Sequence, residues 1–129
     1  MRFLLDTHAF LRWDADAEQL PKPLLKTLQD PAHEIVLSVV SVWEMQIKAT
    51  LGKLELQTPL STLISEQRDK NSLGVLPVSL EHVVALEQLG THHKNPFDRL
   101  LIAQANVEGL TPVSKDDAFR HYDVSVFWV

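Results

Sequence analysis

Four acidic residues in separate parts of the chain are the strongest candidates for a metal-binding or catalytic role. Asp6 directly follows the apolar run FLL, Asp116 follows TPVS, Glu44 lies in the helix expected after EIVLSV, and Asp98 lies in the first turn of the helix NPFDRLLIAQA. In a parallel sheet, strand ends and the starts of the following helices share one edge, where ligands bind. Carboxylates that meet there repel one another, and a divalent cation removes that conflict. The pattern therefore predicts an oxygen-ligand site for Mg²⁺ or Mn²⁺.

Three of these acids also have a purely structural interpretation at a helix N-terminus. Asp6 and Asp116 are suited to cap the helices that follow them. Asp98 comes three residues after Asn95, with Pro96 at the first helical position, and an acid there interacts favourably with the helix dipole. Capping and metal binding are not exclusive.

The fourth acid has two structural interpretations. Glu44 lies three residues after Ser41, which is the spacing of a capping box, and four residues before Lys48, which is the spacing of a surface ion pair. Each acid taken alone favours a structural role. Convergence of all four at one edge favours a metal site.

The elements expected to position these acids alternate between strands and helices. We expect strands at residues 2–5, 34–39, 74–79, 111–114 and 124–129. We expect helices at residues 7–13, 21–30, 41–52, 59–72, 80–89 and 97–108, and a helical turn at 116–121. This alternation predicts βαβ crossovers and a mostly parallel sheet covered by helices on both faces, so the expected fold class is α/β.

Composition narrows the classes of protein that remain. The 129 residues suit one domain, 45% of them are hydrophobic, and a formal net charge of −5 argues against a general polyanion binder. The absence of cysteine excludes disulfides and thiolate metal sites. The N-terminal apolar run is too short for a signal peptide, so we expect a cytoplasmic protein that does not enter a membrane.

Four segments together resemble the PIN-domain ribonucleases, specifically the VapC toxins of bacterial toxin–antitoxin pairs. The segments are LLDTH, SVWEMQIK, NPFDRLLIAQA and PVSKDDAFRHY, and NPFDRLLIAQA is the most specific of them. The resemblance runs from residue 2 to the C-terminus and implies a single PIN domain over residues 1–129, with a three-layer fold. It also implies cleavage of RNA with Mg²⁺, for which Mn²⁺ can substitute, a homodimer, and a complex with a cognate antitoxin.

The resemblance assigns the catalytic and metal-binding positions residue by residue. The acidic positions of the family fall on Asp6, Glu44, Asp98 and Asp116. The family pattern of a hydroxyl residue, a spacer and an aspartate selects Ser114 with Asp116, although the neighbouring Asp117 leaves open which aspartate matters more. Thr7 and Ser114 are candidates to orient the acids, and Lys48 and Arg99 are candidates to contact phosphate.

Other interpretations compete with a nuclease. An aspartyl-phosphate enzyme would carry D-x-D after the first strand, but His8 occupies the second position. No glycine-rich nucleotide loop is present. A non-catalytic protein-binding module that retains the fold and uses the acids structurally remains the alternative. Trp13 and Trp43 are expected to be packing residues.

Overall fold

A parallel sheet of four strands forms the centre of the computed structural model, which describes residues 1–90 and 95–115. Its strands are β1 (Arg2–Leu5), β2 (Glu34–Ser38), β3 (Gly74–Leu76) and β4 (Thr111–Val113), in the spatial order β3-β2-β1-β4. Leu4 of β1 pairs with Val36 on one side and with Pro112 on the other. The predicted parallel α/β fold is confirmed.

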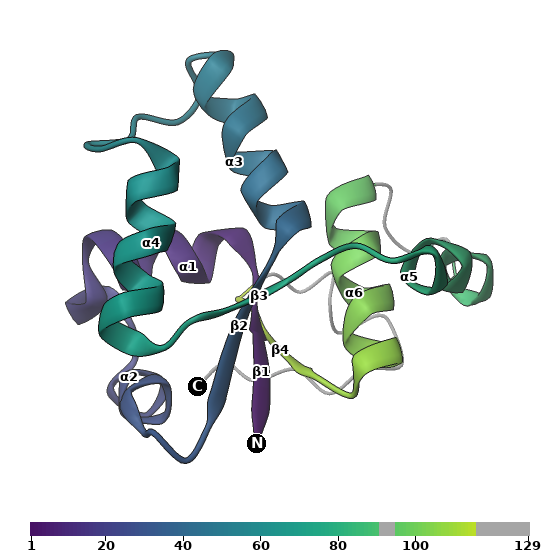
Figure 1. Ribbon diagram of the computed structural model, residues 1–129, viewed down its shortest axis with the longest axis horizontal. Coiled ribbons are helices and arrows are strands. Elements are labelled where there is room, and N and C mark those ends of the chain that lie inside the picture. Colours follow the sequence, from purple (N-terminus) through teal and green to yellow (C-terminus); the bar gives the residue numbers. More distant parts are fainter. Residues whose placement is uncertain (91–94, 116–129) are drawn as a thin grey trace.

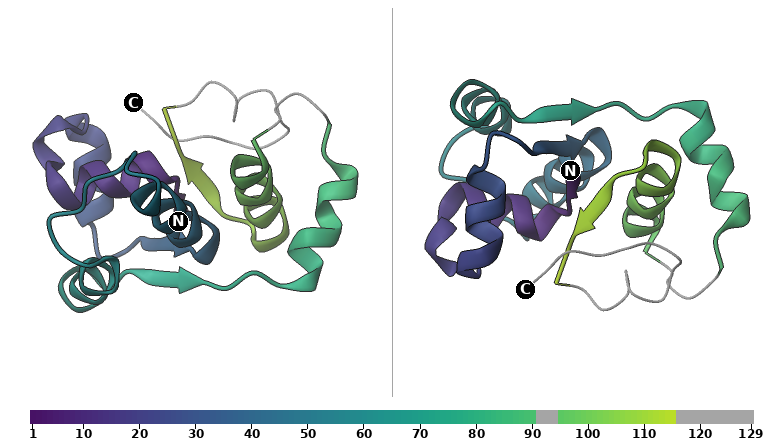
Figure 2. Two further views of the ribbon diagram at one scale, coloured as in Figure 1. Left: turned by 90° about the horizontal axis from the view of Figure 1, so that it is seen from above. Right: turned by 90° about the horizontal axis from the view of Figure 1, so that it is seen from below.

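Helices cover both faces of this sheet. They are α1 (Thr7–Ala15), α2 (Lys22–Gln29), α3 (Val39–Thr50), α4 (Leu60–Asn71), α5 (Leu80–Val84) and α6 (Pro96–Glu108), with 3₁₀ segments at Ala17–Gln19 (η1) and Ala85–Gln88 (η2). Figure 1 shows α1, α2 and α4 on one side of the strands and α5 and α6 on the other. Both views of Figure 2 place α6 between the strands and α5, so α5 is the outermost helix on its side.

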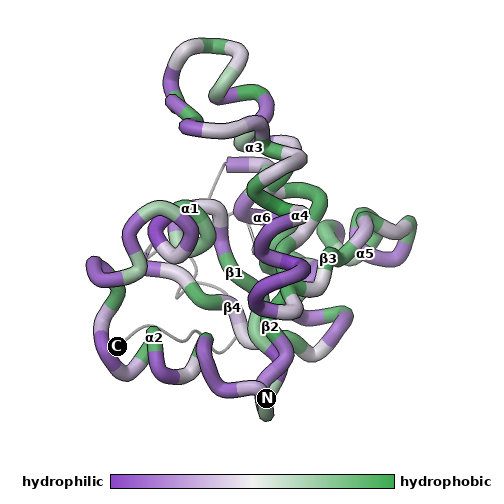
Figure 3. Tube along the Cα trace, turned by 60° about the vertical axis from the view of Figure 1, so that its left-hand side comes forward, coloured by the Kyte–Doolittle hydropathy of each residue, from purple (hydrophilic) through white to green (hydrophobic). Residues whose placement is uncertain are grey.

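Alternating residues of the strands build a separate hydrophobic core on each face. Phe3 and Leu5 of β1 pack with α1 and α2 in one core, whereas Leu4 between them packs against α6 in the other. This is the period-two alternation of a strand buried on both faces. Figure 3 shows the strands as mostly hydrophobic, with hydrophilic and hydrophobic residues alternating along outer helices such as α2.

Most element boundaries differ from the sequence prediction by one or two residues, and three differences affect the shape of the elements. β3 ends at Leu76 rather than at residue 79, because Pro77 has no N–H to continue the ladder. Helix α3 begins at Val39 rather than at residue 41. The helix expected at residues 80–89 is a short α-helix followed by a 3₁₀ segment.

Some predictions fall outside the described residues, namely the helical turn at 116–121 and the final strand at 124–129. Within residues 1–90 and 95–115, no helix combines the length and the apolar character needed to cross a membrane.

Candidate functional site

Asp6 is the buried centre of the candidate site. It directly follows β1 and caps α1, with its Oδ1 accepting a hydrogen bond of 2.7 Å from the backbone N–H of Ala9. Its Oδ2 accepts a second bond of 2.6 Å from the Ser114 hydroxyl, just beyond β4. The predicted cap is confirmed, and Ser114 orients this carboxylate across the two neighbouring strands.

The surroundings of Asp6 make its negative charge costly. Burial raises the pKa of its carboxyl above the ordinary value of 3.8, and the nearby negative charge of Asp98 raises it further. The hydrogen bonds from Ser114 and Ala9 and the influence of His8 act in the opposite direction, but they do not overcome burial. The carboxylate therefore lies where a cation would be stabilising.

Glu44 is a second buried carboxylate, and α3 supplies it. Its Oε1 accepts a hydrogen bond of 2.5 Å from the hydroxyl of Thr7, the residue that follows Asp6. Its Oε2 lies 3.2 Å from the ammonium group of Lys48, so the predicted i,i+4 ion pair is confirmed. Thr7 thus links Glu44 to the start of α1.

The predicted capping box between Ser41 and Glu44 is wrong. Ser38 is the N-cap of α3, and its hydroxyl accepts a hydrogen bond from the backbone N–H of Val40. Because the helix begins two residues earlier than expected, Ser41 lies within the first turns and cannot cap. The hydroxyl oxygen of Ser41 is buried and has no hydrogen-bond partner among the residues that the structure describes.

Asp98 lies in the first turn of α6, as predicted. Asn95 is the N-cap, with its Oδ1 accepting from the N–H groups of Phe97 and Asp98, and Pro96 is the first helical residue. The helix start brings Asp98 close enough to Asp6 for its charge to act on that carboxyl. Arg99 is the next residue, and its Nε is buried with no hydrogen-bond partner within residues 1–90 and 95–115.

The fourth acidic position cannot be placed, because Asp116 and Asp117 lie outside the described residues. Within residues 1–90 and 95–115, no three acidic or histidine side chains come close enough together to hold one ion. Asp6, Glu44 and Asp98 therefore do not form a three-ligand cluster by themselves, and a convergence that includes Asp116 stays a prediction.

The chemistry of the residues that are in place fits a hard cation. Asp6 and Asp98 repel one another, and both offer carboxylate oxygens, the ligands that Mg²⁺ and Mn²⁺ prefer. Glu44 has a weaker need for a cation, because Lys48 already neutralises it. Asp6 and Asp98 are therefore the pair that would hold a metal ion.

Trp43 is not the packing residue that the sequence predicted, although Trp13 is. The side chain of Trp43 is 60% exposed, whereas Trp13 is buried in the core around α1. The Trp43 ring meets the ring of Phe97 edge-on at a centroid distance of 5.3 Å. This contact joins α3 to the start of α6, where Asp98 lies.

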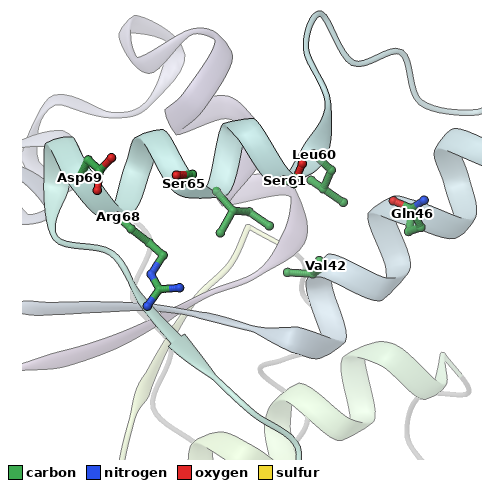
Figure 4. A pocket seen from close by; sticks show the side chains of 8 residues that line it. Val42, Gln46, Leu60, Ser61, Ser65, Arg68 and Asp69 are labelled. Atoms are coloured by element: carbon green, nitrogen blue, oxygen red, sulfur yellow. The ribbon is translucent and has the colours of Figure 1, made fainter.

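A separate cleft lies between α3 and α4. Its volume is about 690 Å³, and Figure 4 shows Val42 and Gln46 of α3 across from side chains of α4 that include Leu60 and Arg68. Of the predicted catalytic residues, the three that the structure describes (Asp6, Glu44 and Asp98) do not line this cleft. It is therefore a surface distinct from the acidic edge of the sheet.

A parallel α/β domain with buried carboxylates at the carboxyl edge of its sheet belongs to the broad class of open α/β folds, in which ligands bind at that edge. The model of the PIN domain family matches residues 3–125, so the chain belongs to the PIN domain family. No match was found among curated proteins.

Solved structures share this fold over nearly the whole chain. VapBC2 from Rickettsia felis, bound to a DNA fragment from its promoter, matches with a TM-score of 0.73 at 16% identity, covering 98% of this chain and 96% of the other. DNA-bound VapBC from Salmonella typhimurium matches with a TM-score of 0.67 at 14% identity, covering 98% and 96%. FitAcB from Neisseria gonorrhoeae matches with a TM-score of 0.61 at 20% identity, also covering 98% and 96%. At such identities the likeness establishes the fold.

Proposed function

We propose that this protein is a Mg²⁺- or Mn²⁺-dependent endoribonuclease and the toxin of a type II toxin–antitoxin pair. The observation that carries the proposal is the buried carboxylate of Asp6, whose pKa is raised by burial and by the charge of Asp98. Capping alone requires no second aspartate beside a buried one. Membership of the PIN domain family, whose members are generally nucleases, supports the same activity.

The acidic residues and their hydroxyl partners have distinct roles in this proposal. Asp6 and Asp98 would be the direct metal ligands, while Glu44 and Asp116 would bind a second ion or hold coordinating waters. Ser114 and Thr7 fix the carboxylates of Asp6 and Glu44 through the hydrogen bonds described above.

Cleavage hydrolyses a phosphodiester bond of RNA. When bound at these carboxylates, Mg²⁺ or Mn²⁺ would act as a Lewis acid, which would stabilise charge on the scissile phosphate and activate water. Arg99 follows Asp98 on α6, and Lys48 lies one turn from Glu44 on α3; in this proposal both side chains contact phosphate oxygens of the RNA. Asp117 is the alternative to Asp116 at the remaining acidic position.

The proposed partners are an RNA substrate, a cognate antitoxin and a second copy of the chain, in the cytoplasm. The fold shared with the VapBC and FitAB structures supports an antitoxin partner. The α3–α4 cleft suits a segment of that antitoxin, because Val42, Leu60 and Ile64 offer apolar surface and Arg68 and Asp69 offer charges.

One observation favours the alternative of a non-catalytic protein-binding module. Glu44 is fully engaged by Thr7 and Lys48, as a purely structural glutamate would be. In such a module the carboxylates stabilise the fold, and neutralising Asp98 leaves the function intact.

A cleavage assay on antitoxin-free protein distinguishes the nuclease from the non-catalytic binding module. The assay uses a panel of structured RNAs with Mg²⁺, Mn²⁺ or EDTA, and compares wild type, Asp98→Asn and Glu81→Gln. Glu81 is a matched control, because it is also an acid in the first turn of a helix but belongs to α5. We expect cuts at discrete sites with either metal, reduced about 100-fold or more by Asp98→Asn and unchanged by Glu81→Gln.

Two other outcomes of the cleavage assay would contradict this expectation. Equal cutting by wild type and Asp98→Asn would indicate a contaminating nuclease. No cutting by wild type with either metal would favour the binding module.

A further inference from the structure

Gln104 is a fully buried polar residue on an otherwise apolar stretch of α6. Its exposure is 0%, and its buried neighbours along the helix are Leu101, Ile102, Ala103 and Ala105. A buried amide is costly unless its donors and acceptor are satisfied. All of them find partners here, and the partners lie in three different segments of the chain.

The hydrogen bonds of Gln104 fix the orientation of its amide. Oε1 accepts from the Ser38 hydroxyl at 2.5 Å, and Nε2 donates to the Pro77 carbonyl at 3.3 Å. A carbonyl can only accept, so the nitrogen must face Pro77 and the oxygen must face Ser38. The amide therefore joins α6 to the ends of β2 and β3.

His82 extends this network to α5. Nε2 of Gln104 also lies 3.3 Å from Nδ1 of His82, which accepts a bond from the Ser79 N–H in the capping box of α5. Because Nδ1 faces two donors, the ring proton lies on Nε2, which is 2.9 Å from the carboxylate of Glu108. Glu108 is the last residue of α6, so the network begins and ends on the same helix.

The network connects the two helices that carry predicted metal-site acids. Ser38 caps α3, six residues before Glu44, and Gln104 lies on α6, six residues after Asp98. Six residues correspond to about 9 Å along a helix. The Ser38–Gln104 hydrogen bond therefore directly links the start of α3, which carries Glu44, to α6, which carries Asp98.

We propose that Gln104 is a positioning residue, which holds α3 and α6 at the separation that the acids of the site need. This inference rests on the proposed nuclease function. Gln104 touches neither substrate nor metal in this role. It acts through Ser38 on α3 and through its own helix on Asp98.

Stability alone does not account for a buried amide at this position. An apolar side chain of similar volume would avoid the desolvation of the amide, and replacing both partners of a buried hydrogen bond with apolar groups can be nearly neutral in stability. A satisfied polar network instead selects one arrangement of the helices that it joins. An apolar residue at position 104 could not fix the arrangement of α3 and α6, and therefore could not fix the positions of Glu44 and Asp98.

The test compares Gln104→Met with Gln67→Met. Gln67 is a matched control, because it is buried on α4 and hydrogen-bonded to Asp14 and Asn71, away from Asp6 and Glu44. We expect Gln104→Met to lower kcat about 10- to 100-fold with KM within about twofold, because a misplacement near 1 Å suffices for such a loss. Mn²⁺ affinity, measured by electron paramagnetic resonance, should fall about tenfold, while Gln67→Met changes neither quantity.

A second variant tests the link itself and covers the case in which Gln104→Met does not fold. Ser38→Ala removes the same bond from the other side, so it should lower kcat and Mn²⁺ affinity in the same direction. Where both variants fold, the double variant should be less impaired than additive losses predict.

The results separate the positioning role from the nuclease function. Retention of kcat and Mn²⁺ affinity by Gln104→Met, or equal losses in Gln67→Met, would show that Gln104 is only a packing residue. A wild-type protein that binds Mn²⁺ but cuts no RNA would contradict the nuclease, while the Mn²⁺ affinities of the variants would still decide the role of Gln104. A wild type that neither binds nor cuts would contradict both.

Discussion

At the scale of single residues, the acids of this chain combine structural and chemical roles. Asp6 caps α1 and lies beside the charge of Asp98, and Glu44 is held by Thr7 and Lys48. A cap made by a buried carboxylate satisfies helix N–H groups but carries a charge that burial disfavours. This conflict can be measured in the metal-free protein.

Asp6→Asn should stabilise the metal-free protein at neutral pH. The folded-state pKa of Asp6 is raised, so its ionised form destabilises the fold above that pKa, and the penalty disappears as the pH falls toward the ordinary value of 3.8. Asparagine can still cap α1 but carries no charge. Chemical denaturation at several pH values should show an advantage for Asp6→Asn at pH about 7 that shrinks toward pH about 4.

Asp6→Ala is the control for this measurement, because it removes both the charge and the cap. It should be about 1 kcal/mol less stable than Asp6→Asn. A wild type more stable than Asp6→Asn at neutral pH would mean that the bonds from Ser114 and Ala9 outweigh the burial of the charge.

At the scale of elements, the helix ends decide where the acids lie. Ser38 starts α3 two residues earlier than expected, which turns Ser41 inward and leaves Trp43 exposed. The start of α6 followed the prediction, because Asn95 and Pro96 are strong local signals. The end of α6 depends on Gly109, which has a φ of 67° and is followed by the strand that supports Ser114.

Gly109→Ala should therefore destabilise the protein by about 1 kcal/mol. Apart from its chain neighbours, an added Cβ would meet no atom of the described residues within 4 Å. The cost is therefore the left-handed backbone conformation, partly offset by a less flexible unfolded chain. A melting curve should show a loss of about 3–6 °C.

Gly74→Ala is the matched control for the glycine prediction. Its Cβ would make ordinary contacts of 3.5 Å with Val36 and 3.6 Å with the Ile35 carbonyl, and its φ lies outside the left-handed region. We expect a change below about 0.5 kcal/mol. Equal losses from both substitutions would contradict the backbone explanation.

At the scale of the whole molecule, metal binding should be coupled to folding. A cation that relieves the repulsion between Asp6 and Asp98 binds the folded chain and not the unfolded one, so Mg²⁺ or Mn²⁺ should raise the melting temperature. At about 100 times the dissociation constant the gain is about 2.7 kcal/mol. Asp98→Asn should reduce this shift and Glu81→Gln should not.

Calorimetry or a dye-based melt checks this coupling. Identical shifts in wild type and Asp98→Asn would place the bound cation elsewhere on the surface. A melting temperature unaffected by millimolar metal would argue against a site preformed in the absence of RNA.

The sequence alone determined the parallel α/β class and the order of the elements. Alternating apolar strands and amphipathic helices carry that information locally. Asp6 was identifiable because it directly follows a strand, and Asp98 because it follows a helix start signal. Asp116, Asp117 and the final strand lie outside the residues that could test them. The assignment of a nuclease came from the resemblance of four short segments and not from periodicity.

Only the tertiary structure decided which side chains meet across the sheet. The bonds from Thr7 to Glu44, from Ser114 to Asp6 and from Ser38 to Gln104 join residues 37, 108 and 66 positions apart, and no local pattern encodes them. In the sequence, Gln104 stands out only as a polar residue in an apolar stretch of its helix. That pattern does not indicate which residue is its hydrogen-bond partner. Partners are set by the sheet order β3-β2-β1-β4, because strand order determines which loops and helix ends become neighbours in space.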